Sequence, residues 1–429
     1  MNFLKNHSRY LIRKYFRDSL AQLKNLEKIK PDSALLKTMR SAVVKLPFYK
    51  NIGLNNTTAI HNELQRFPII RKADLLNKNS RLYPRSSRHR LFKGQTSGTT
   101  GSPLVIYRSY ESILFENAFI RRHWALSGFK TGMERATLRG DIIVPLWKKK
   151  PPFWFLNKYD NQLIVSTRHI KREYIHFIAD KIDAFSPFFL EAYPSAAYEM
   201  ARLLESEGRV LHIPYIYTGS EMLYPHQRET IQKQFSGRVM DFYGMAERVA
   251  FFTECTHGNL HVNTDYSYIE ILDKSGYSTD NLGYVTGTTY HNQAMPLVRY
   301  QLTDMTKWKK GKCPCGCNFP MVDPIQGKFE DIIYGGKGDP VSPSVLTFAF
   351  KGLNHISRSQ VAQINTTTWE IRIVPYMDFS KQESRKLIEN IKTMVDRDIH
   401  VKIKLVDDIP KTRAGKFRWI INETEQLCS

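Results

Sequence analysis

A loop rich in glycine and hydroxyl side chains has the composition of a phosphate-binding loop. Its residues are Thr96, Ser97, Gly98, Thr99, Thr100, Gly101 and Ser102. Glycine reaches backbone dihedrals that are closed to other residues, so successive backbone N–H groups can converge on an anion while the hydroxyls donate further hydrogen bonds. The familiar nucleotide loop ends in Gly-Lys-Ser or Gly-Lys-Thr, whereas Ser102 and Pro103 follow Gly101 here. The loop therefore has no cation of its own for a polyphosphate, and a simple turn is the alternative.

Three charged residues further along the chain could complete a nucleotide site. Lys416 follows Gly415 in IPKTRAGKFRWI, after an expected strand, and a mobile domain could carry it to the site. Glu247, in DFYGMAERVAFF, follows an expected strand end and could hold Mg²⁺ through one carboxylate. Asp304, in MPLVRYQLTDMTKW, could accept hydrogen bonds from ribose hydroxyls. Each alone could be a surface or turn residue, and their joint appearance in this order favours a site.

Four of the five cysteines and two histidines could form a metal centre. Cys255 and His257 in ECTHGN, with Cys313 and Cys315 in CPCGCN, could supply four ligands to a tetrahedral zinc. The gaps are tighter than the usual two residues, Cys317 or His261 could replace a ligand, and buried reduced cysteines are the alternative. An odd number of cysteines argues against a disulfide framework. Four protein ligands leave no open position, so a zinc here would be structural.

The elements that must position these residues follow an α/β pattern. Residues 169–185 predict a helix with an apolar face that includes Ile178 and Ile182, and short β-rich runs such as GRVMDFYG predict strands ending in loops. Glycine and charges interrupt the pattern near residues 325–333. We therefore expect a large N-terminal domain over residues 1–329 and a small α+β domain over residues 330–429, a common domain size. In the second, residues 381–395 predict a helix and 400–406 a half-buried strand.

Composition restricts the class of protein and its partners. With 42% hydrophobic and 24% charged residues, the 429-residue chain has the profile of a globular protein. It contains no apolar run long enough to span a bilayer and no secretory signal pattern, so we expect a cytoplasmic protein. The net charge of +22 favours an anionic partner: a nucleotide, a nucleic acid, a phospholipid or an acidic glycan. A basic zinc-containing nucleic-acid-binding protein is a rival hypothesis, although no motif for specific nucleic-acid binding accompanies the charge.

Five motifs in order resemble those of the AMP-forming acyl-adenylating enzymes, which include acyl-CoA synthetases and nonribosomal adenylation domains. They are TSGTTGSP, YGMAE, PLVRYQLTD, GKFEDII and PKTRAGKFR. The chain is most similar to the phenylacetate-CoA ligase branch and its CapK-type relatives, which are encoded with capsule and surface-polysaccharide genes. Supporting stretches are MRSAVVKLPFYKN, FPIIRKADLL, CTHGNLHVN and CPCG, so the resemblance covers nearly the whole chain. Related sequences carry a similar cysteine and histidine set.

The resemblance implies an α/β fold with a large multi-sheet N-terminal domain and a small mobile α+β C-terminal domain. It implies that residues Thr96 to Ser102 wrap the β- and γ-phosphates of ATP and that Lys416 is the catalytic lysine. Glu247 would bind Mg²⁺ and Asp304 the ribose. The adenine and α-phosphate would be lined by Ser220, Glu221, Tyr243, Gly244 and Met245. The reaction would be activation of a carboxylic acid as acyl-AMP, then transfer to CoA, a carrier-protein thiol or an amine, in surface-polysaccharide biosynthesis.

The chain also departs from the family pattern. Lys328 stands where arginine is usual, and lysine cannot hold ribose or phosphate by a planar bidentate contact. Glu330 stands where the family has a hinge aspartate. A catalytically degenerate scaffold is therefore a further alternative. The acid itself is not specified, although Tyr193, Tyr217 and Phe242 would suit an aryl or apolar acid if they are not simply core. The stretch PLWKKKPPFWFLNKY could touch a membrane or a lipid-linked glycan, or could be a basic loop packed by its aromatics.

Overall fold

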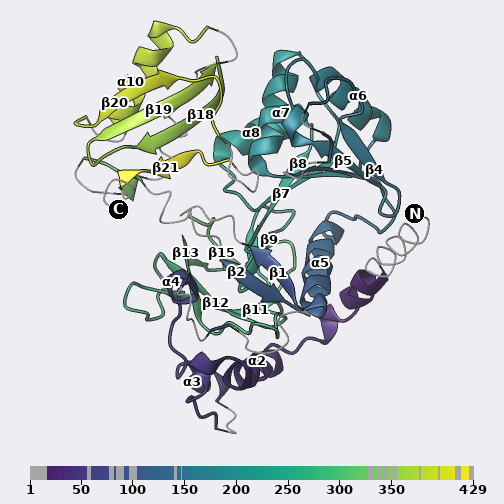
Figure 1. The fold of residues 1–429 in the computed structure, drawn as a ribbon, viewed down its shortest axis with the longest axis vertical. Coiled ribbons are helices and arrows are strands. Elements are labelled where there is room, and N and C mark those ends of the chain that lie inside the picture. The colour runs from purple at the N-terminus through teal and green to yellow at the C-terminus, as the bar shows by residue number, and fades with distance from the viewer. Residues whose placement is uncertain are drawn as a thin grey trace. The chain divides into compact units, whose positions relative to one another are not determined.

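The structure is a computed structural model of the chain, and it is of mixed α/β class, as the sequence predicts (Figure 1). It describes residues 17–55, 59–76, 82–83, 91–95, 104–139, 143–145, 147–326, 333–336, 340–341, 346, 349–350, 353, 355–375, 378–394, 397–410 and 417–424. Two compact units are formed, Met1–Thr131 with Met240–Gln326 and Gly132–Val239 with Gly327–Ser429. The expected division between residues 329 and 330 stays a prediction. Within the described ranges, no helix combines the length and apolar character needed to cross a membrane.

The first unit is built mostly from antiparallel strands. One sheet has the order β11 (Ser267–Leu272), β12 (Gly283–Thr289) and β13 (Tyr300–Thr306). Five further strands follow in the order β14 (Trp308–Lys309), β15 (Met321–Val322), β10 (Leu260–Val262), β9 (Phe251–Glu254) and β8 (Arg238–Gly244). The hairpin of β1 (Phe92–Gln95) and β2 (Val105–Arg108) completes the strands. The helices and 3₁₀ turns are η1 (Leu26–Lys28), α2 (Pro31–Lys45), η2 (Pro47–Tyr49), α3 (Ile60–Leu64), α4 (Lys72–Leu76) and α5 (Tyr110–Ala125).

The start of α5 is set by its local sequence. Ser109 has an extended backbone, and its hydroxyl accepts a hydrogen bond from the backbone N–H of Ser112, which satisfies one of the free donors at the helix start. Because β2 ends at Arg108, the strand and the helix are joined with Ser109 as the only linking residue. The polar side chains at the end of β2 and in the first turns of α5 therefore lie close together, and several of them belong to the site described below.

The first part of the second unit is a largely parallel sheet with helices. Its strands follow the order β7 (Tyr215–Gly219), β6 (Phe189–Ala192), β3 (Arg135–Arg139), β5 (Gln162–Ser166) and β4 (Trp154–Asn157), and β4 alone of these runs antiparallel to its neighbour. The helices are η4 (Thr167–His169), α6 (Ile175–Phe185), α7 (Pro194–Ser206) and α8 (Pro225–Gln234) (Figure 1). The predicted helix over residues 169–185 begins later, at Ile175, and Phe177 of the expected apolar face is 38% exposed.

The second part of this unit is the α+β structure predicted for the C-terminal region. Its sheet has the order β20 (His400–Leu405), β19 (Thr368–Pro375), β18 (Ile356–Gln363) and β21 (Ile420–Asn422), with α10 (Lys381–Met394) packed on it (Figure 1). A short hairpin is formed by β16 (Ile333–Tyr334) and β17 (Pro340–Val341). Leu387 and Ile391 of α10 are fully buried in one core with Trp369 and Ile371 of β19. The apolar residues that recur along the helix therefore pack on the apolar residues that alternate along the strand, in one core.

Candidate functional site

The structure describes part of the predicted nucleotide site. Thr96 to Ser102, Lys328, Glu330 and Lys416 lie outside the described residues. Tyr243, Gly244, Met245, Glu247 and Asp304 lie in the first unit, and Ser220 and Glu221 in the second.

The two predicted acidic residues of the first unit are held by tyrosines from each other's segments. The Tyr243 hydroxyl, at the end of β8, donates to Asp304 Oδ2 in β13 at 2.6 Å. Glu247 lies three residues beyond the end of β8. Its Oε1 accepts a hydrogen bond at 3.3 Å from the hydroxyl of Tyr300, at the start of β13. Both carboxylates are only 8% exposed. The motifs YGMAE and VRYQLTD thus form one hydrogen-bonded cluster.

The tyrosines of this cluster are firmly protonated. Burial, and then the charge of Asp304, raises the pKa of Tyr243 well above its ordinary value. Burial, and then the charge of Glu247, likewise raises the pKa of Tyr300. A phenol with a raised pKa stays a hydrogen-bond donor at neutral pH, so each tyrosine donates to its partner's carboxylate oxygen and keeps its own proton.

An arginine that the sequence reasoning did not select lies beside Glu247. The Arg108 Nη2 donates to the backbone carbonyl of Ala246 at 2.6 Å, and a β-carbon built on Gly94 would lie 2.3 Å from the Arg108 Cζ. Glycine at position 94 therefore leaves room for the guanidinium to lie flat against β1. Burial, and then the charge of Arg248, lowers the pKa of Arg108, while Glu116 and Glu247 oppose this shift. Arginine nonetheless remains charged in proteins, so Arg108 is a permanent cation of this cluster.

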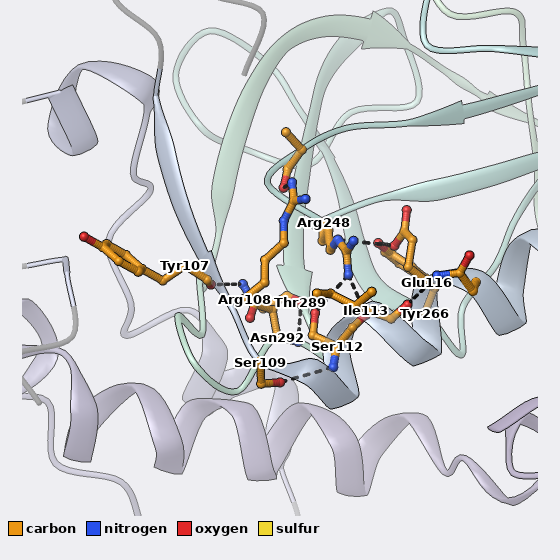
Figure 2. Close-up of polar contacts among 12 residues, drawn as sticks. Tyr107, Arg108, Ser109, Ser112, Ile113, Glu116, Arg248, Tyr266, Thr289 and Asn292 are labelled. Carbon is orange, nitrogen blue, oxygen red and sulfur yellow. Dashed lines mark hydrogen bonds and ion pairs between the residues drawn. The ribbon is translucent and has the colours of Figure 1, made fainter. Parts of the chain in front are cut away.

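A second arginine ties the segment after Glu247 to α5 (Figure 2). Arg248 has a left-handed backbone, with φ of 58°, which is strained for a residue with a side chain. Its Nη1 donates to the backbone carbonyl and the hydroxyl of Ser112, and its Nε lies 3.7 Å from Glu116 Oε2. Glu116 also accepts a hydrogen bond from the Tyr266 hydroxyl at 2.6 Å. This network holds the backbone on both sides of Glu247.

In the second unit, Glu221 binds two backbone amides. Its Oε2 accepts from the N–H of Ser195, in the first turn of α7, at 3.1 Å, and its Oε1 accepts from the N–H of Phe417 at 2.9 Å. Ser220, beside it, has a left-handed backbone with φ of 70°. Phe417 directly follows Lys416 in the sequence. Glu221 therefore anchors the chain next to the predicted catalytic lysine, a contact that no local sequence signal indicated.

Four of the candidate metal ligands converge in the first unit. One ligand atom from each of Cys255, His261, Cys313 and Cys315 lies within 4.8 Å of all the others. The Cys255 and Cys313 sulfurs are 3.6 Å apart, and Cys315 Sγ is 3.4 Å from His261 Nε2. A tetrahedral site with Zn–S bonds of about 2.3 Å has S···S edges of about 3.8 Å, so these spacings fit zinc.

His261, the alternative histidine, takes the position in this group that was expected for His257. His261 lies in β10, and its Nδ1 is 2.9 Å from the carbonyl oxygen of Phe319, so the ring can donate there and direct Nε2 at the cysteines. The His257 ring nitrogen lies 3.5 Å from the Thr256 hydroxyl, while its backbone N–H approaches Cys255 Sγ at 3.4 Å. Cys317, the other alternative, is exposed and donates its backbone N–H to Cys315 Sγ at 3.4 Å.

Comparisons with known proteins find relatives by sequence and by fold. Residues 333–423 match the family model of the CapK C-terminal domain. Protein CapK of Staphylococcus aureus is 27% identical over 378 residues, which cover 86% of this chain and 82% of that protein. Phenylacetate-coenzyme A ligase of Thermus thermophilus is 25% identical over 162 residues, or 35% of this chain and 36% of that protein.

Two solved structures show the same fold. A 2-hydroxyisobutyryl-CoA ligase in its postadenylation state matches with a TM-score of 0.69 at 16% identity, covering 93% of this chain and 90% of that one. An anthranilate CoA ligase with bound anthranoyl-AMP matches with a TM-score of 0.51 at 14% identity, covering 78% and 67%. These matches confirm the resemblance inferred from the motifs. The chain is a homologue of CapK and of phenylacetate-CoA ligase, carries a CapK C-terminal domain, and has the α/β fold of the adenylate-forming CoA ligases.

Proposed function

We propose that this protein activates a carboxylic acid with ATP. The carboxylate oxygen attacks the α-phosphorus, the bond from that phosphorus to the bridging oxygen breaks, and acyl-AMP and pyrophosphate form. The acyl group then passes to the thiol of CoA or a carrier protein, or to an amine. We assign the phosphates to residues 96–102 and the ribose to Asp304. We assign adenine and the α-phosphate to Tyr243, Gly244 and Met245 and, from the second unit, to Ser220 and Glu221.

The cluster of Glu247 and Asp304 carries this proposal. Their motifs are separated by more than fifty residues, yet a tyrosine of each motif donates to the acid of the other. Carboxylates this deeply buried need opposite charge or strong hydrogen bonds. Each tyrosine donates to one oxygen of its partner acid, and carboxylate oxygens are also the groups that accept from ribose hydroxyls, as we propose for Asp304, or bind a cation, as we propose for Glu247. A core that served stability alone would gain more from apolar side chains at both positions.

The negative charge that develops in the transition state is the basis for the roles that we assign to the cations. The attack brings a carboxylate to a phosphate, and negative charge concentrates on the transferring phosphoryl group. Mg²⁺, when bound at Glu247, would neutralise phosphate oxygens. We assign the amine of Lys416 to the substrate carboxylate and the α-phosphate, and Lys328 to the nucleotide. Removing a group aimed at developing charge slows catalysis by on the order of a hundredfold or more.

The acceptor and the biological setting rest on the relatives. Two solved structures of 2-hydroxyisobutyryl-CoA ligase hold its acyl-AMP together with CoA, which supports a thiol acceptor for the related fold. A role in surface-polysaccharide biosynthesis is the setting that the resemblance of the motifs to CapK-type proteins implies, and we propose it for this chain. We also propose a cytoplasmic location, where cysteines stay reduced; the cysteines that the structure describes form no disulfide.

Isotope exchange between pyrophosphate and ATP, measured over a panel of aryl and aliphatic acids, tests the proposal. We expect exchange that depends on one class of acid and on Mg²⁺, and a loss of about a hundredfold in Lys416→Ala. Lys402→Ala, an exposed lysine of β20 in the same domain, is the matched control and should exchange at the normal rate. Absence of exchange with every acid together with absence of ATP binding would overturn the proposal, as would a fully active Lys416→Ala protein.

We also propose that Cys255, His261, Cys313 and Cys315 hold a structural zinc. Their spacing supports it, as do donors around the sulfurs: Asn259 Nδ2 lies 3.1 Å from Cys313 Sγ, and backbone N–H groups approach Cys255 and Cys315. The ion would join the segment after β9 to the segment before β15. We expect one zinc per chain by elemental analysis in the wild type and in His257→Gln, and a loss of zinc in Cys313→Ser and His261→Gln. Retention of zinc in the last two variants would reject this ligand set.

A further inference from the structure

An exposed group of apolar side chains lies beside lysines at the edge of the second unit's sheet. Its apolar members are Trp147, Phe155, Leu156, Tyr159 and Phe177, which are 80%, 57%, 39%, 38% and 38% exposed. Its cations are Lys148, Lys149, Lys150 and Lys158. We call this set the β4 patch, because Phe155 and Leu156 belong to that strand. Exposed large side chains gathered in this way mark interaction sites on soluble proteins.

The fold brings the parts of the β4 patch together around one buried ring. Phe153 is fully buried and packs on His169 at 4.9 Å, on Tyr174 at 4.6 Å and on Phe177 at 6.4 Å between ring centroids. The carbonyl oxygen of Lys148 lies 3.1 Å from His169 Nε2. The lysine loop, the start of β4 and the first turn of α6 are therefore joined. Strand side chains alternate between faces, so the consecutive residues Phe155 and Leu156 lie on opposite faces of β4, and a partner that contacts both must meet the strand at its edge.

Among the described residues, β4 pairs with β5 alone and is the last strand of its sheet, so its outer edge has no partner strand there. Soluble proteins usually protect such an edge with charges, prolines or a covering segment. The residues on this edge are instead aromatic and aliphatic at Phe155 and Leu156, both exposed. Trp147 is 80% exposed, whereas Phe153 is fully buried. The alternative hypothesis, a basic loop packed by its own aromatic residues, is therefore correct for Phe153 and wrong for Trp147.

Charge around the β4 patch is strongly positive. Residues 147–177 contain seven lysines and arginines against two acids. One acid, Asp160, is bonded to the buried Arg135 at 2.6 Å and so does not offset the surface lysines. The acids further along α6, Asp180 and Asp183, each pair with Arg209 at 2.6 Å. The patch therefore presents its lysines with little compensating charge.

We propose that the β4 patch docks this protein on an anionic phospholipid bilayer. Tryptophan, tyrosine and phenylalanine partition to the depth of the lipid headgroups, and lysines beside them are attracted to anionic lipids. An acidic glycan or a nucleic acid would use the same lysines and could stack on the aromatic rings. The aliphatic side chain of Leu156 can neither pair with the charges of such ligands nor stack on their rings, whereas a bilayer would bury its apolar surface. This inference does not depend on the proposed adenylation chemistry.

Flotation of the full chain with lipid vesicles tests the proposal. We compare vesicles of phosphatidylcholine alone with vesicles of phosphatidylcholine and phosphatidylglycerol at physiological salt. We expect binding to the anionic vesicles that weakens as salt rises. The triple variant Lys148→Gln, Lys149→Gln, Lys150→Gln should bind roughly a hundredfold more weakly, since each lysine near an anionic surface is worth about fivefold. The variant Trp147→Ala, Phe155→Ala should lose about tenfold.

Matched controls separate docking from unspecific effects. Tyr277→Ala removes a 73% exposed aromatic residue of the first unit, and Lys310→Gln removes an exposed lysine there. Both should bind vesicles as the wild type does, and all variants should keep the wild-type circular dichroism spectrum. The proposal is overturned by equal partitioning onto neutral and anionic vesicles, by anionic binding that survives both patch variants, or by binding to an acidic polysaccharide without binding to vesicles.

Discussion

Replacement of His226 by phenylalanine should make the protein more resistant to acid. The His226 ring lies in an aromatic group: it stacks on Tyr224 at 16° between planes, meets Tyr198 edge-on, and lies 5.2 Å from the ring of Trp419. Its Nδ1 is buried and has no hydrogen-bond partner within the described part of the chain. Phenylalanine can fill the same space without losing a bond at Nδ1, so the substitution mainly removes the titrating group.

The size of the effect follows from the pKa of the imidazole. Burial, and then the charge of Arg202, lowers the pKa of His226 from 6.5 to about 4. In the unfolded chain the ring takes up a proton near pH 6.5, and in the folded protein only near pH 4. The stability that the protein gains with a neutral His226 ring is therefore complete above pH 6.5 and is lost as the pH falls toward 4. At pH 5 the loss amounts to about 2 kcal/mol of unfolding free energy.

Urea unfolding of the wild type and of His226→Phe at pH 7.5 and pH 5 measures this loss. We expect the variant to gain about 2 kcal/mol on the wild type between the two pH values, because it has no imidazole to protonate. Tyr198→Phe, which alters the same aromatic group without touching the imidazole, is the control and should follow the wild type. Identical pH dependence in the wild type and His226→Phe would refute the assignment of a buried neutral ring.

The acid sensitivity bears on function because Trp419 belongs to the CapK C-terminal domain. Trp419 and Tyr224 lie in the same core, with ring centroids 4.5 Å apart, and Trp419 is two residues from Phe417. Protonation of His226 would place a charge between these rings. The attachment of the segment that follows Lys416 should therefore weaken in acid before the rest of the unit unfolds.

Three further substitutions have defined outcomes. Tyr300→Phe removes the hydrogen bond to Glu247 and should raise the Mg²⁺ concentration for half-maximal exchange about fivefold, with a parallel weakening of Mn²⁺ binding measured by paramagnetic resonance. Glu221→Gln weakens a charge-assisted anchor and should slow pyrophosphate exchange at least about tenfold while leaving the thermal midpoint nearly unchanged; a shift in the midpoint alone would point to a structural role. Arg248→Met leaves the mostly buried Glu116 without its ion pair, although the hydrogen bond from Tyr266 remains, and should cost about 2 kcal/mol of stability, measured by urea unfolding.

Local patterns in the sequence predicted what depends on local packing. Ile178 and Ile182 recur at helical spacing and are fully buried on α6. Leu387 and Ile391 do the same on α10. The start of α6 was less predictable, because Ile170 and Tyr174 fit the same period but lie between the 3₁₀ turn η4, which ends at His169, and the first helical residue, Ile175. The spacing of apolar residues predicts which face of a helix is buried, but it does not predict the residue at which the helix begins.

The choice between His257 and His261 shows why a site can be only partly readable. His257 lies two residues from Cys255, so spacing alone favours it. The outcome depends on strand pairing, since β10 pairs with β15 through His261 and Met321 and with β9 through His261 and Thr253. That register places His261 next to the segment that contains Cys313 and Cys315. Pairing between distant strands has no signal within a short stretch of sequence.

Arg108 is a further source of positive charge for the polyphosphate that we propose the glycine-rich loop binds. The loop contains no lysine, and Lys416 lies at the far end of the chain. Arg108 and Arg248 lie near Glu116 and Glu247, and the cluster of Glu247 also contains Asp304, so the acids outnumber the arginines by one before any ligand binds. A divalent cation at Glu247 would leave the cluster with an excess of positive charge, and a polyphosphate would remove that excess. Because the Arg108 guanidinium already donates to the carbonyl of Ala246 and fits the space at Gly94, its charge would require no reorganisation on binding the nucleotide that we propose.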